Sequence, residues 1–407
     1  MAKIAMKFGG TSVADLDRIR NVAQLVKKEV DRGHQVAVVV SAMSGETNKL
    51  VGYINALSPH YDPKEYDTVV AAGEQVTCGL LALALGAIGI KARSFLGWQI
   101  PIQTSSMHAS ARIEDIPSEN LDECLASGTV AVVAGFQGVA EGNRVSTLGR
   151  GGSDTSAVAV AAAMKADRCD IYTDVDGVYT NDPRIESKAR RMEKIAFEEM
   201  LEMASLGAKV LQTRSVEIAM QHRVPVRVLS TFDPDAGGTL LCDEEDIVEK
   251  KPVTGIAYSR DEAKISLMKI PDHPGIAAAI FGPLANAGIN VDMIVQNISE
   301  DGKRTDLTFT CPRTELPRAL KALEDAAPAI GYREITSDAN VAKISIIGIG
   351  MRTHPGVAQT MFRTLSEKGI NISVISTSEI KVSVLIAEEY VELAVRALHS
   401  AYELDVA

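Results

Sequence analysis

The first part of the chain alternates compact apolar runs with longer amphipathic stretches. "QVAVVVSAM" (35–43) and "TVAVVAGF" (129–136) are rich in valine, as strands are that lie buried on both faces in a parallel sheet. The stretch 15–33 repeats apolar residues at helical spacing and reaches Gly33, a residue type that often ends a helix. This alternation predicts an α/β domain with a mostly parallel central sheet. Ligands of such sheets bind beyond the carboxyl ends of the strands, so the residues just after each apolar run are the first candidates for a site.

A different pattern begins after the acidic segment "CDEEDIVEKKP" (242–252), which we interpret as a linker. The segments 264–294 and 343–375 match element for element: an alternating strand, a His-Pro-Gly turn, a helix, a Gly-Ile-Asn turn and a second strand. Each continues with a further strand candidate, at 304–311 and 380–387, and then a helix. Two small ferredoxin-like (βαββαβ) domains are therefore expected. A His-Pro-Gly turn before a helix leaves backbone N–H groups free, which favours a role in binding a small ligand's carboxylate over a purely structural duplication.

The composition narrows the class of protein. A chain of 407 residues is too long for one ordinary core, which agrees with several domains. A formal net charge of -11 argues against a nucleic-acid partner or an anionic membrane, since both need a basic face. The apolar run 79–90 is too short to span a bilayer, and the N-terminus lacks the apolar core of a signal peptide. The cysteines are scattered without a CxxC pair, which indicates reduced thiols in the cytoplasm rather than disulfides or a zinc site: Cys78, Cys124, Cys169, Cys242 and Cys311.

The residues after the first apolar run form a candidate anion site. In "KFGGTSV" (7–13), Lys7 is followed by Gly9 and Gly10 and then by two hydroxyl side chains. This is not a Walker A loop, because GxxxxGK[ST] is absent and the lysine precedes the glycines. A lysine at the end of a strand is usually a solvated surface charge, so this segment is a weak signal by itself.

A second glycine-rich segment, "TLGRGGSDTSAVAVAAAM" (147–164), strengthens the prediction of a phosphate site. Glycines flank Arg150, Ser153 and Asp154 follow, and a stretch rich in alanine and valine predicts a helix. A glycine loop that opens a helix presents N–H groups and the helix dipole to phosphate oxygens. A plain tight turn explains one glycine here, but not three around an arginine and an aspartate.

A third polar segment, "YTDVDGVYTNDPRI" (172–185), leaves two interpretations open. It is not an EF-hand, because Ile185 stands where the bidentate glutamate would be. A loop that binds ribose and base fits the composition, and a solvated hairpin with an "NDP" turn fits it as well.

Together these segments resemble the aspartate kinases of the amino-acid kinase fold, along nearly the whole chain. The two repeats are similar to paired ACT domains. The resemblance implies an α/β protein: a three-layer α/β/α amino-acid kinase domain with a mostly parallel central sheet, followed by two ferredoxin-like (βαββαβ) ACT domains. The segments that carry it, besides the repeats, are "KFGGTSV", "VVVSAMSGETNKL", "AAGEQVT", "AGFQGV", "LGRGGSDTSA", "DVDGVYTNDPRI" and "GAKVL". The implied domains are 1–245 (catalytic), 246–263 (linker and first regulatory strand), 264–336 (first ACT domain) and 337–407 (second ACT domain).

The resemblance also implies a reaction: transfer of the γ-phosphoryl group of ATP to the side-chain carboxylate of L-aspartate, giving 4-phospho-L-aspartate, the first step toward lysine, threonine and methionine. An ionised carboxylate needs no general base, so the task is to bring two anions together and to neutralise the charge of the transition state. Mg²⁺ is expected to arrive with ATP and to keep much of its water, without a dedicated protein cage. Two alternatives are another amino-acid kinase, acting on UMP, glutamate or acetylglutamate, and a non-catalytic amino-acid sensor.

Roles can be distributed over the matching segments. Lys7 is the candidate for charge neutralisation, and the resemblance implies that Asp154 orients Lys7 or magnesium-bound water. Arg150 suits the α-carboxylate of aspartate as a bidentate partner. Glu74, in "AAGEQVT", suits the ammonium; a helix-surface acid is the alternative, but the small residues that flank Glu74 leave room for a ligand. The remaining substrate-binding candidates are Ser41, Thr47, Gly151, Gly152 and Ser153. The nucleotide-binding candidates besides Lys7 are Gly9, Gly10, Thr173, Asp174, Tyr179, Asp182, Arg184 and Lys209.

The ACT repeats imply feedback regulation by an end-product amino acid, which is lysine, threonine or both. By resemblance this effector binds between ACT units where subunits pair, so a homo-oligomer is expected, either a dimer or a tetramer. His273 and His354 lie in the turns and are expected to be structural. The candidate effector contacts are Asp272, Gly275, Ile276, Ala277, Asn290 and Gln296 in the first repeat, and Val357, Asn371, Ile372 and Glu379 in the second.

Overall fold

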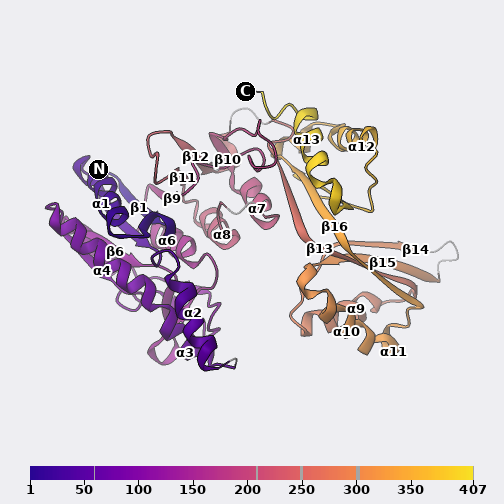
Figure 1. Cartoon of the computed structure of the whole chain (residues 1–407), viewed down its shortest axis with the longest axis horizontal. Coiled ribbons are helices and arrows are strands. Elements are labelled where there is room, and N and C mark those ends of the chain that lie inside the picture. The colour runs from indigo at the N-terminus through magenta and orange to yellow at the C-terminus, as the bar shows by residue number, and fades with distance from the viewer. Residues whose placement is uncertain (59, 208–209, 248–250, 299–302, 407) are drawn as a thin grey trace. The chain divides into compact units, whose positions relative to one another are not determined.

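The computed structural model describes residues 1–58, 60–207, 210–247, 251–298 and 303–406. The chain forms two compact units (Figure 1). The first unit consists of Met1–Val178, Arg191–Ala204 and Lys209–Val248, and the second of Tyr179–Arg190, Ser205–Ala208 and Glu249–Ala407. The segment Tyr179–Arg190 thus belongs to the second unit, although the chain on both sides of it belongs to the first.

An eight-stranded sheet organises the described part of the first unit. Neighbouring strands run parallel except for one antiparallel pair, β11 with β12, which confirms the predicted α/β fold with a mostly parallel sheet. The valine-rich runs form β2 and β6, which pair directly with each other. In sheet order the strands are β10 (Lys194–Ala196), β12 (Gly238–Cys242), β11 (Val226–Ser230), β9 (Arg168–Thr173), β1 (Lys3–Phe8), β2 (Gln35–Val40), β6 (Val130–Ala134) and β3 (Ala92–Phe95).

Helices cover both faces of this sheet, which gives three layers. On one face, α1 and α4 pack against alternate residues of β1, namely Ile4, Met6 and Phe8. On the other face α6 contacts β1, β2 and β9 and lies beside α8. The helices of this part of the chain are α1 (Leu16–Asp31), α2 (Glu46–Leu57), α3 (Pro63–Val70), α4 (Ala72–Ala87), α5 (Glu119–Ala126), α6 (Gly152–Ala163), α7 (Phe197–Ser205) and α8 (Thr213–His222).

The helix predicted within 15–33 is α1. Asp15 caps its start by accepting a hydrogen bond from the Arg18 backbone N–H at 2.8 Å, and Gly33 follows its end with φ +82. The apolar residues of α1 pack into the core, so their helical spacing predicted the buried face of the helix correctly.

A smaller four-stranded sheet accompanies the main one in the first unit. Its order is β5-β4-β7-β8, and its last strand, β8, leads directly into the glycine-rich segment. The strands are β4 (Gln103–Thr104), β5 (Ile113–Asp115), β7 (Gln137–Ala140) and β8 (Arg144–Thr147).

The helices α3 and α4 follow each other with only Ala71 between them. The run Pro63–Ala87 is long and apolar enough to cross a membrane by length and composition. The apolar face of α4, however, packs into the core beside the sheet and α1. Two acidic residues of the run, Asp67 and Glu74, are also buried inside the unit. We therefore interpret this run as a core helix.

The second unit contains a six-stranded sheet in its described residues. In Figure 1, α9, α10 and α11 lie toward one end of its long strands, β13 and β16, and α12 and α13 lie toward the other. In sheet order the strands are β14 (Asp292–Ile298), β15 (Arg304–Cys311), β13 (Gly255–Pro271), β16 (Glu334–Ile347), β18 (Lys381–Ala387) and β17 (Val374–Thr377). The helices are α9 (Ile276–Asn286), α10 (Leu316–Asp325), α11 (Ala327–Ile330), α12 (Val357–Glu367) and α13 (Val391–Ala401).

The two repeats share these long strands. β13 pairs with β16 from Gly255 opposite Ile347 to Met268 opposite Glu334, with register shifts on both sides of Glu262. The start of β13 therefore adds a strand to the second repeat, although it precedes the first repeat in sequence. The boundary predicted between residues 336 and 337 falls inside β16. Because both repeats use β13 and β16, the two domains are interlocked and do not simply follow each other along the chain.

The His-Pro-Gly turns have the same backbone conformation in both repeats. Gly275 and Gly356 cap α9 and α12 with φ of +95 and +93, values in the left-handed region that glycine adopts without strain. The internal duplication seen in the sequence is thus a duplication of local structure as well.

Candidate active site

A cleft of about 510 Å³ opens in the first unit at the carboxyl ends of β1, β2 and β9, where a parallel sheet is expected to bind ligands. The glycine loop before α6 and the start of α4 complete its walls. The predicted residues that line it are Lys7, Gly9, Gly10, Ser41, Thr47, Glu74, Arg150, Gly151, Gly152, Ser153, Asp154, Thr173 and Asp174. The structure therefore brings all the predicted substrate-binding residues into one cavity.

Lys7 and Asp154 form an ion pair in this cleft. Lys7 lies near the end of β1 and Asp154 in the first turn of α6, and the distance from Nζ to Oδ1 is 2.6 Å. Only 10% and 13% of the two side chains are exposed, so solvent screens the pair weakly. The ammonium carries three N–H donors, so Asp154 does not occupy all of them. Lys7 can therefore bind a second anion while it stays beside Asp154.

The glycines after Lys7 allow three segments to approach one another. A Cβ on Gly9 would lie 3.2 Å from Lys7 Nζ, and a Cβ on Gly10 would lie 3.1 Å from the Ala42 carbonyl oxygen. The backbone N–H of Gly9 donates to the Tyr172 carbonyl at 3.3 Å, so this N–H already has a partner within the protein. The role of Gly9 as a donor to phosphate stays a prediction. The structure explains instead why a glycine is needed here, because a side chain would crowd Lys7.

The glycine loop before α6 is shaped by backbone conformation. Gly149 and Gly151 have φ of +78 and +71, and Gly151 caps the helix. A Cβ on Gly151 would lie 1.7 Å from Gln212 Cγ, and a Cβ on Gly152 would lie 2.8 Å from a Phe136 ring carbon. Arg150 lies between these glycines, exposed and lining the cleft.

Glu74 is a buried carboxylate of the cleft, so its interpretation as a helix-surface acid is wrong. Its side chain lies in the first turn of α4, and Oε1 accepts a hydrogen bond from the Ala42 N–H at 3.0 Å. Oε2 is buried without a hydrogen-bond partner among the described residues. Burial raises the pKa of Glu74 from 4.5 to about 7, because the charged form loses its hydration. Gly73 permits this arrangement, since a Cβ there would lie 2.7 Å from the Ala42 Cβ.

Hydroxyl side chains line the remaining walls. Ser41 follows β2, and its N–H donates to the Phe8 carbonyl at 3.1 Å, which joins the ends of two neighbouring strands. Thr47 lies in the first turn of α2, which begins after Gly45 in the left-handed region. Thr173 ends β9 and donates from Oγ1 to Asp174 Oδ1 at 3.2 Å.

Three predicted nucleotide-binding residues lie apart from these. Tyr179, Asp182 and Arg184 belong to the second unit and are not among the residues that line the cleft. Arg184 Nη2 donates to Asp182 Oδ2 at 2.7 Å, and this guanidinium lowers the pKa of the Asp182 carboxyl. Lys209 lies outside the described residues. The roles of these four residues toward nucleotide stay predictions.

Several residues that line the cleft were not predicted. They share a simple sequence signal, because each lies inside one of the segments that resemble the kinases. The additional lining residues are Thr11, Ala42, Met43, Ser44, Gly45, Phe136 and Gly149.

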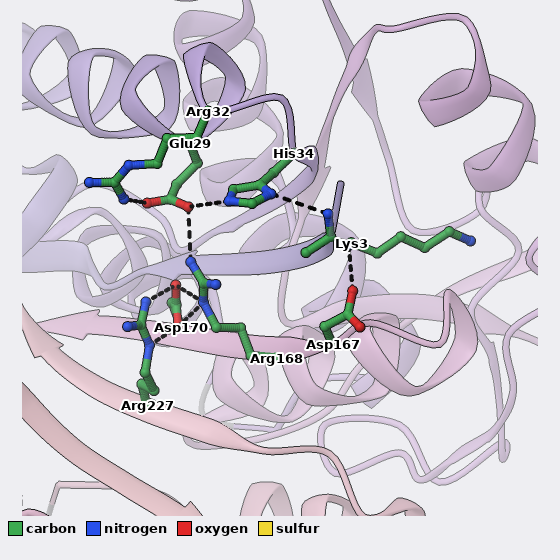
Figure 2. A network of polar contacts seen from close by, with 9 residues as sticks. Lys3, Glu29, Arg32, His34, Asp167, Arg168, Asp170 and Arg227 are labelled. Carbon is green, nitrogen blue, oxygen red and sulfur yellow. Dashed lines mark hydrogen bonds and ion pairs between the residues drawn. The ribbon is translucent and has the colours of Figure 1, made fainter.

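A second cavity of the first unit, about 330 Å³, lies between α1, β11 and β12. Figure 2 shows the polar network beside it: Arg227 donates to both oxygens of the buried Asp170 at 2.7 Å, and Arg168 joins Asp170 to Glu29. These charges neutralise one another and tie β9 and β11 to α1. The network therefore has a structural role, and we assign the functional site to the cleft around Lys7.

The candidate effector contacts lie in the second unit, near the starts of α9 and α12 and on the strands that follow these helices. Ile276 and Val357 are the first residues of the two helices and are buried. Asn290 and Asn371, which hold equivalent positions in the two repeats, are both exposed. Glu379 pairs with Arg352 across 3.3 Å. Each turn histidine contacts a backbone carbonyl through Nδ1, His273 at Pro274 and His354 at Gly350.

Comparison with known families agrees with this architecture. A model described as the amino acid kinase family matches residues 2–230, and models described as ACT domains match residues 265–328 and 344–402. An aspartokinase of Pseudomonas aeruginosa is 54% identical over 407 residues, covering 100% of this chain and 98% of its own length. An aspartate kinase of Pseudomonas putida is 54% identical over 405 residues with the same coverage.

Two solved structures extend the similarity to three dimensions. E. coli aspartokinase III in complex with aspartate and ADP, in its R-state, has a TM-score of 0.82 and 28% identity, covering 98% of this chain and 99% of that one. The same E. coli enzyme in complex with lysine and aspartate, in its T-state, has a TM-score of 0.76 and 29% identity over the same shares.

Proposed function

This chain belongs to the aspartate kinases of the amino acid kinase family, and we propose that it transfers the γ-phosphoryl group of ATP to the side-chain carboxylate of L-aspartate. The product is 4-phospho-L-aspartate. The observation that carries the proposal is the convergence of Lys7, Asp154, Glu74 and Arg150 on one cleft. Together they supply a cation for phosphate, an acid that holds it, and opposite charges for the two ends of an amino acid.

The chemistry requires little from the protein except position and charge. The acceptor carboxylate is ionised at neutral pH, so the enzyme does not need to remove a proton before attack. The barrier comes from bringing two anions together and from charge on the transferring phosphoryl group. Lys7 is nearly buried, so its positive charge acts on that group with little screening. Asp154 holds the Lys7 ammonium near the carboxyl end of β1. The other N–H donors of the ammonium are left for phosphate oxygens.

Aspartate is held by its α-amino and α-carboxylate groups. Glu74 offers the ammonium a buried carboxylate whose Oε2 is otherwise unpaired. Binding a cation there removes the cost of that unpaired oxygen, so affinity for the ammonium follows from burial. Arg150 can bind the α-carboxylate through two parallel N–H donors. Ser41 and Thr47 supply hydroxyls to phosphate and substrate, and the segment Gly151–Ser153 shapes the wall beside Arg150.

The nucleotide lies on the side of the cleft formed by Thr173 and Asp174, with its phosphates toward Lys7 and Gly10. We also propose that the nucleotide contacts four further residues, solely because the segments around them resemble the kinases: Tyr179, Asp182, Arg184 and Lys209. For the E. coli relative, the bound nucleotide is ADP.

Magnesium is proposed to enter with ATP. Asp154 and Asp174 are the aspartates that line the cleft, and either could hold magnesium-bound water, so the residues fit such an ion. Among the described residues no group of three His, Cys, Asp or Glu side chains could hold a metal, so phosphate oxygens and water would supply its other ligands. When bound, the ion neutralises part of the triphosphate charge.

Feedback inhibition is proposed for the second unit. ACT domains match both repeats, and the E. coli relative was solved with lysine bound in its T-state. We propose lysine, threonine or both as the effector, bound at the start of α9 or α12 where subunits pair in a dimer or tetramer. We also propose a cytoplasmic location, which the free, buried cysteines support.

A direct assay tests the proposed reaction. The purified full chain is incubated with Mg-ATP and L-aspartate, and hydroxylamine traps the acyl phosphate as a hydroxamate, which is detected as its coloured ferric complex. Hydroxamate formation that depends on aspartate and is absent with UMP, glutamate or acetylglutamate supports the proposal. ATP-dependent phosphorylation of one of those acceptors instead of aspartate would contradict it, and binding of lysine or threonine without any turnover would identify a sensor.

A further inference from the structure

Asp67 is a fully buried acidic residue that the proposed mechanism does not use. It lies on α3 with no exposed surface, and it is not among the residues that line the cleft. Burying a carboxylate costs several kcal/mol unless partners hold it. Its partners therefore indicate what the residue does.

Those partners come from two different segments. Thr147 donates from Oγ1 to Asp67 Oδ1 at 2.5 Å, and the Ala109 N–H donates to the same oxygen at 3.0 Å. Oδ2 lies 2.6 Å from His108 Nδ1, and since a carboxylate only accepts, the histidine donates. One carboxylate thus joins the end of β8 to the loop that contains His108 and Ala109.

Both segments support the loop that carries Arg150. Thr147 is the last residue of β8, and only Leu148 and Gly149 separate it from Arg150. The carbonyl oxygen of Ala109 lies 3.1 Å from where a Cβ of Gly149 would be, so the loop rests on the segment that Asp67 holds. Arg214 reinforces this contact by donating to the Leu148 carbonyl at 2.6 Å and to the Ala111 carbonyl at 2.9 Å.

Asp67 also shares a helical run with Glu74. Seven positions separate the two residues, which is about two helical turns, so both lie on nearly the same side of the run. The Ala71 N–H continues the helical pattern between them by donating to the Asp67 carbonyl at 3.1 Å. The two consecutive helices α3 and α4 therefore hold Glu74 at the ammonium end and, through Asp67, the loop of Arg150 at the carboxylate end.

We propose that Asp67 is a positioning residue that sets the spacing between Glu74 and Arg150, and through it the affinity for L-aspartate. This inference rests on the proposed function of the cleft. A misplaced arginine weakens binding of the α-carboxylate while Lys7, Asp154 and the nucleotide side of the cleft keep their geometry. The effect of disturbing Asp67 is therefore selective for aspartate.

The hydroxyl of Thr147 is the best place to test this. Replacing Asp67 itself would leave the buried donors of His108 and Thr147 unpaired and would weaken the fold as a whole. Thr147→Val removes only the hydroxyl at nearly constant volume, and Thr147→Ser restores it. Thr104→Val is the matched control, because Thr104 Oγ1 is another buried hydroxyl of the same small sheet, bonded to Ser146 Oγ at 2.6 Å and not to Asp67.

Steady-state kinetics of the full chain give the result. Thr147→Val is expected to raise the aspartate KM about tenfold, the loss of one hydrogen bond to a charged group, with the ATP KM and kcat changed less than about threefold. Thr147→Ser should restore the aspartate KM, and Thr104→Val should leave it unchanged even where both valine variants melt earlier. An unchanged aspartate KM in Thr147→Val, or the same rise in Thr104→Val, overturns the positioning role. If the unaltered chain does not phosphorylate aspartate, the proposed function fails, and the inference fails with it.

Discussion

The Nζ atom of Lys7 lies 2.6 Å from Oδ1 of Asp154, although Lys7 lies near the end of β1 and Asp154 in the first turn of α6. Side chains alternate along a strand, so Lys7 points to the α6 face while Met6 and Phe8 enter the core beside α1. A small residue at Gly9 lets the ammonium stay beside the loop. The pair places one positive charge where a phosphoryl group can reach it.

Removing the ammonium tests this charge directly. Lys7→Ala is expected to lower kcat at least about 100-fold, since a preorganised charge on the transferring group is lost. Lys3→Ala is the control, because Lys3 lies on the same strand but pairs with Asp122 at the surface. Hydroxamate assays with both variants give the comparison. A kcat for Lys7→Ala within a few fold of the unaltered chain would remove Lys7 from the mechanism.

Glu74 is expected to act on aspartate alone. Glu74→Gln keeps the size of the side chain but removes the charge that binds the ammonium, so the aspartate KM should rise about 10- to 100-fold while the ATP KM changes little. Because the pKa of Glu74 is about 7, the aspartate KM of the unaltered chain should also rise as the pH falls below 7. The glutamine variant should lack that pH dependence. Equal increases in both KM values would contradict the assignment.

The same raised pKa predicts an effect on stability. Folded Glu74 keeps its proton up to about pH 7, whereas the unfolded chain releases it near pH 4.5. Between these values the unfolded state binds fewer protons, so the free energy of unfolding falls as the pH rises, by at most about 3 kcal/mol. Without ligand, Glu74→Gln should therefore be more stable than the unaltered chain at pH 8, and the difference should shrink toward pH 4.5. Denaturant melts at several pH values measure this, and a variant that is less stable at pH 8 would refute it.

Close packing at Gly73 predicts a loss of both stability and affinity. A methyl group there would lie 2.7 Å from the Ala42 Cβ, so Gly73→Ala must push α4 away from the loop after β2. We expect a loss of about 1–3 kcal/mol in the free energy of unfolding and a raised aspartate KM. Gly79→Ala, on the same helix, is the control, since nothing lies within 4 Å of a Cβ at that position. Equal changes in stability and in the aspartate KM of the two variants would show that the contact between Gly73 and Ala42 does not determine either quantity.

The duplicated turns offer a test of which repeat binds the effector. Asn290→Ala and Asn371→Ala remove equivalent exposed amides of the Gly-Ile-Asn turns. If the effector binds the first repeat, Asn290→Ala should raise the concentration of lysine or threonine that half-inhibits the kinase about tenfold, and Asn371→Ala should not. Inhibition curves of both variants decide between the repeats. If neither amino acid inhibits the unaltered chain, the proposed regulation is wrong.

Much of the fold followed from local patterns. The valine-rich runs and the helical spacing in 15–33 identified β2, β6 and α1, because a buried strand and an amphipathic helix impose their periods on neighbouring residues. The repeats were visible for the same reason, and Gly275 and Gly356 show that equal sequence produced equal turns. The glycines around Arg150 also predicted a special loop, and two of them do adopt the left-handed backbone conformation.

Other properties depended on segments that are distant in sequence. The sequence predicts an ammonium ligand at Glu74 but does not exclude a helix-surface acid, because nothing in "AAGEQVT" shows that Ala42 lies against it. The membership of Tyr179–Arg190 in the second unit was equally hidden, since its partners are Ile256, Tyr258 and His399. Asp67 gave no signal at all in the sequence.

By itself, then, the sequence determined the order of helices and strands, the duplicated second unit and the kinds of chemical groups near each strand end. The tertiary structure alone decided which of those groups are buried, which are paired and how far apart they lie. The physical reason is that periodicity and turn chemistry act over a few residues. Burial and charge pairing depend instead on which remote segments pack together, as Asp67 with Thr147 and Lys7 with Asp154 do.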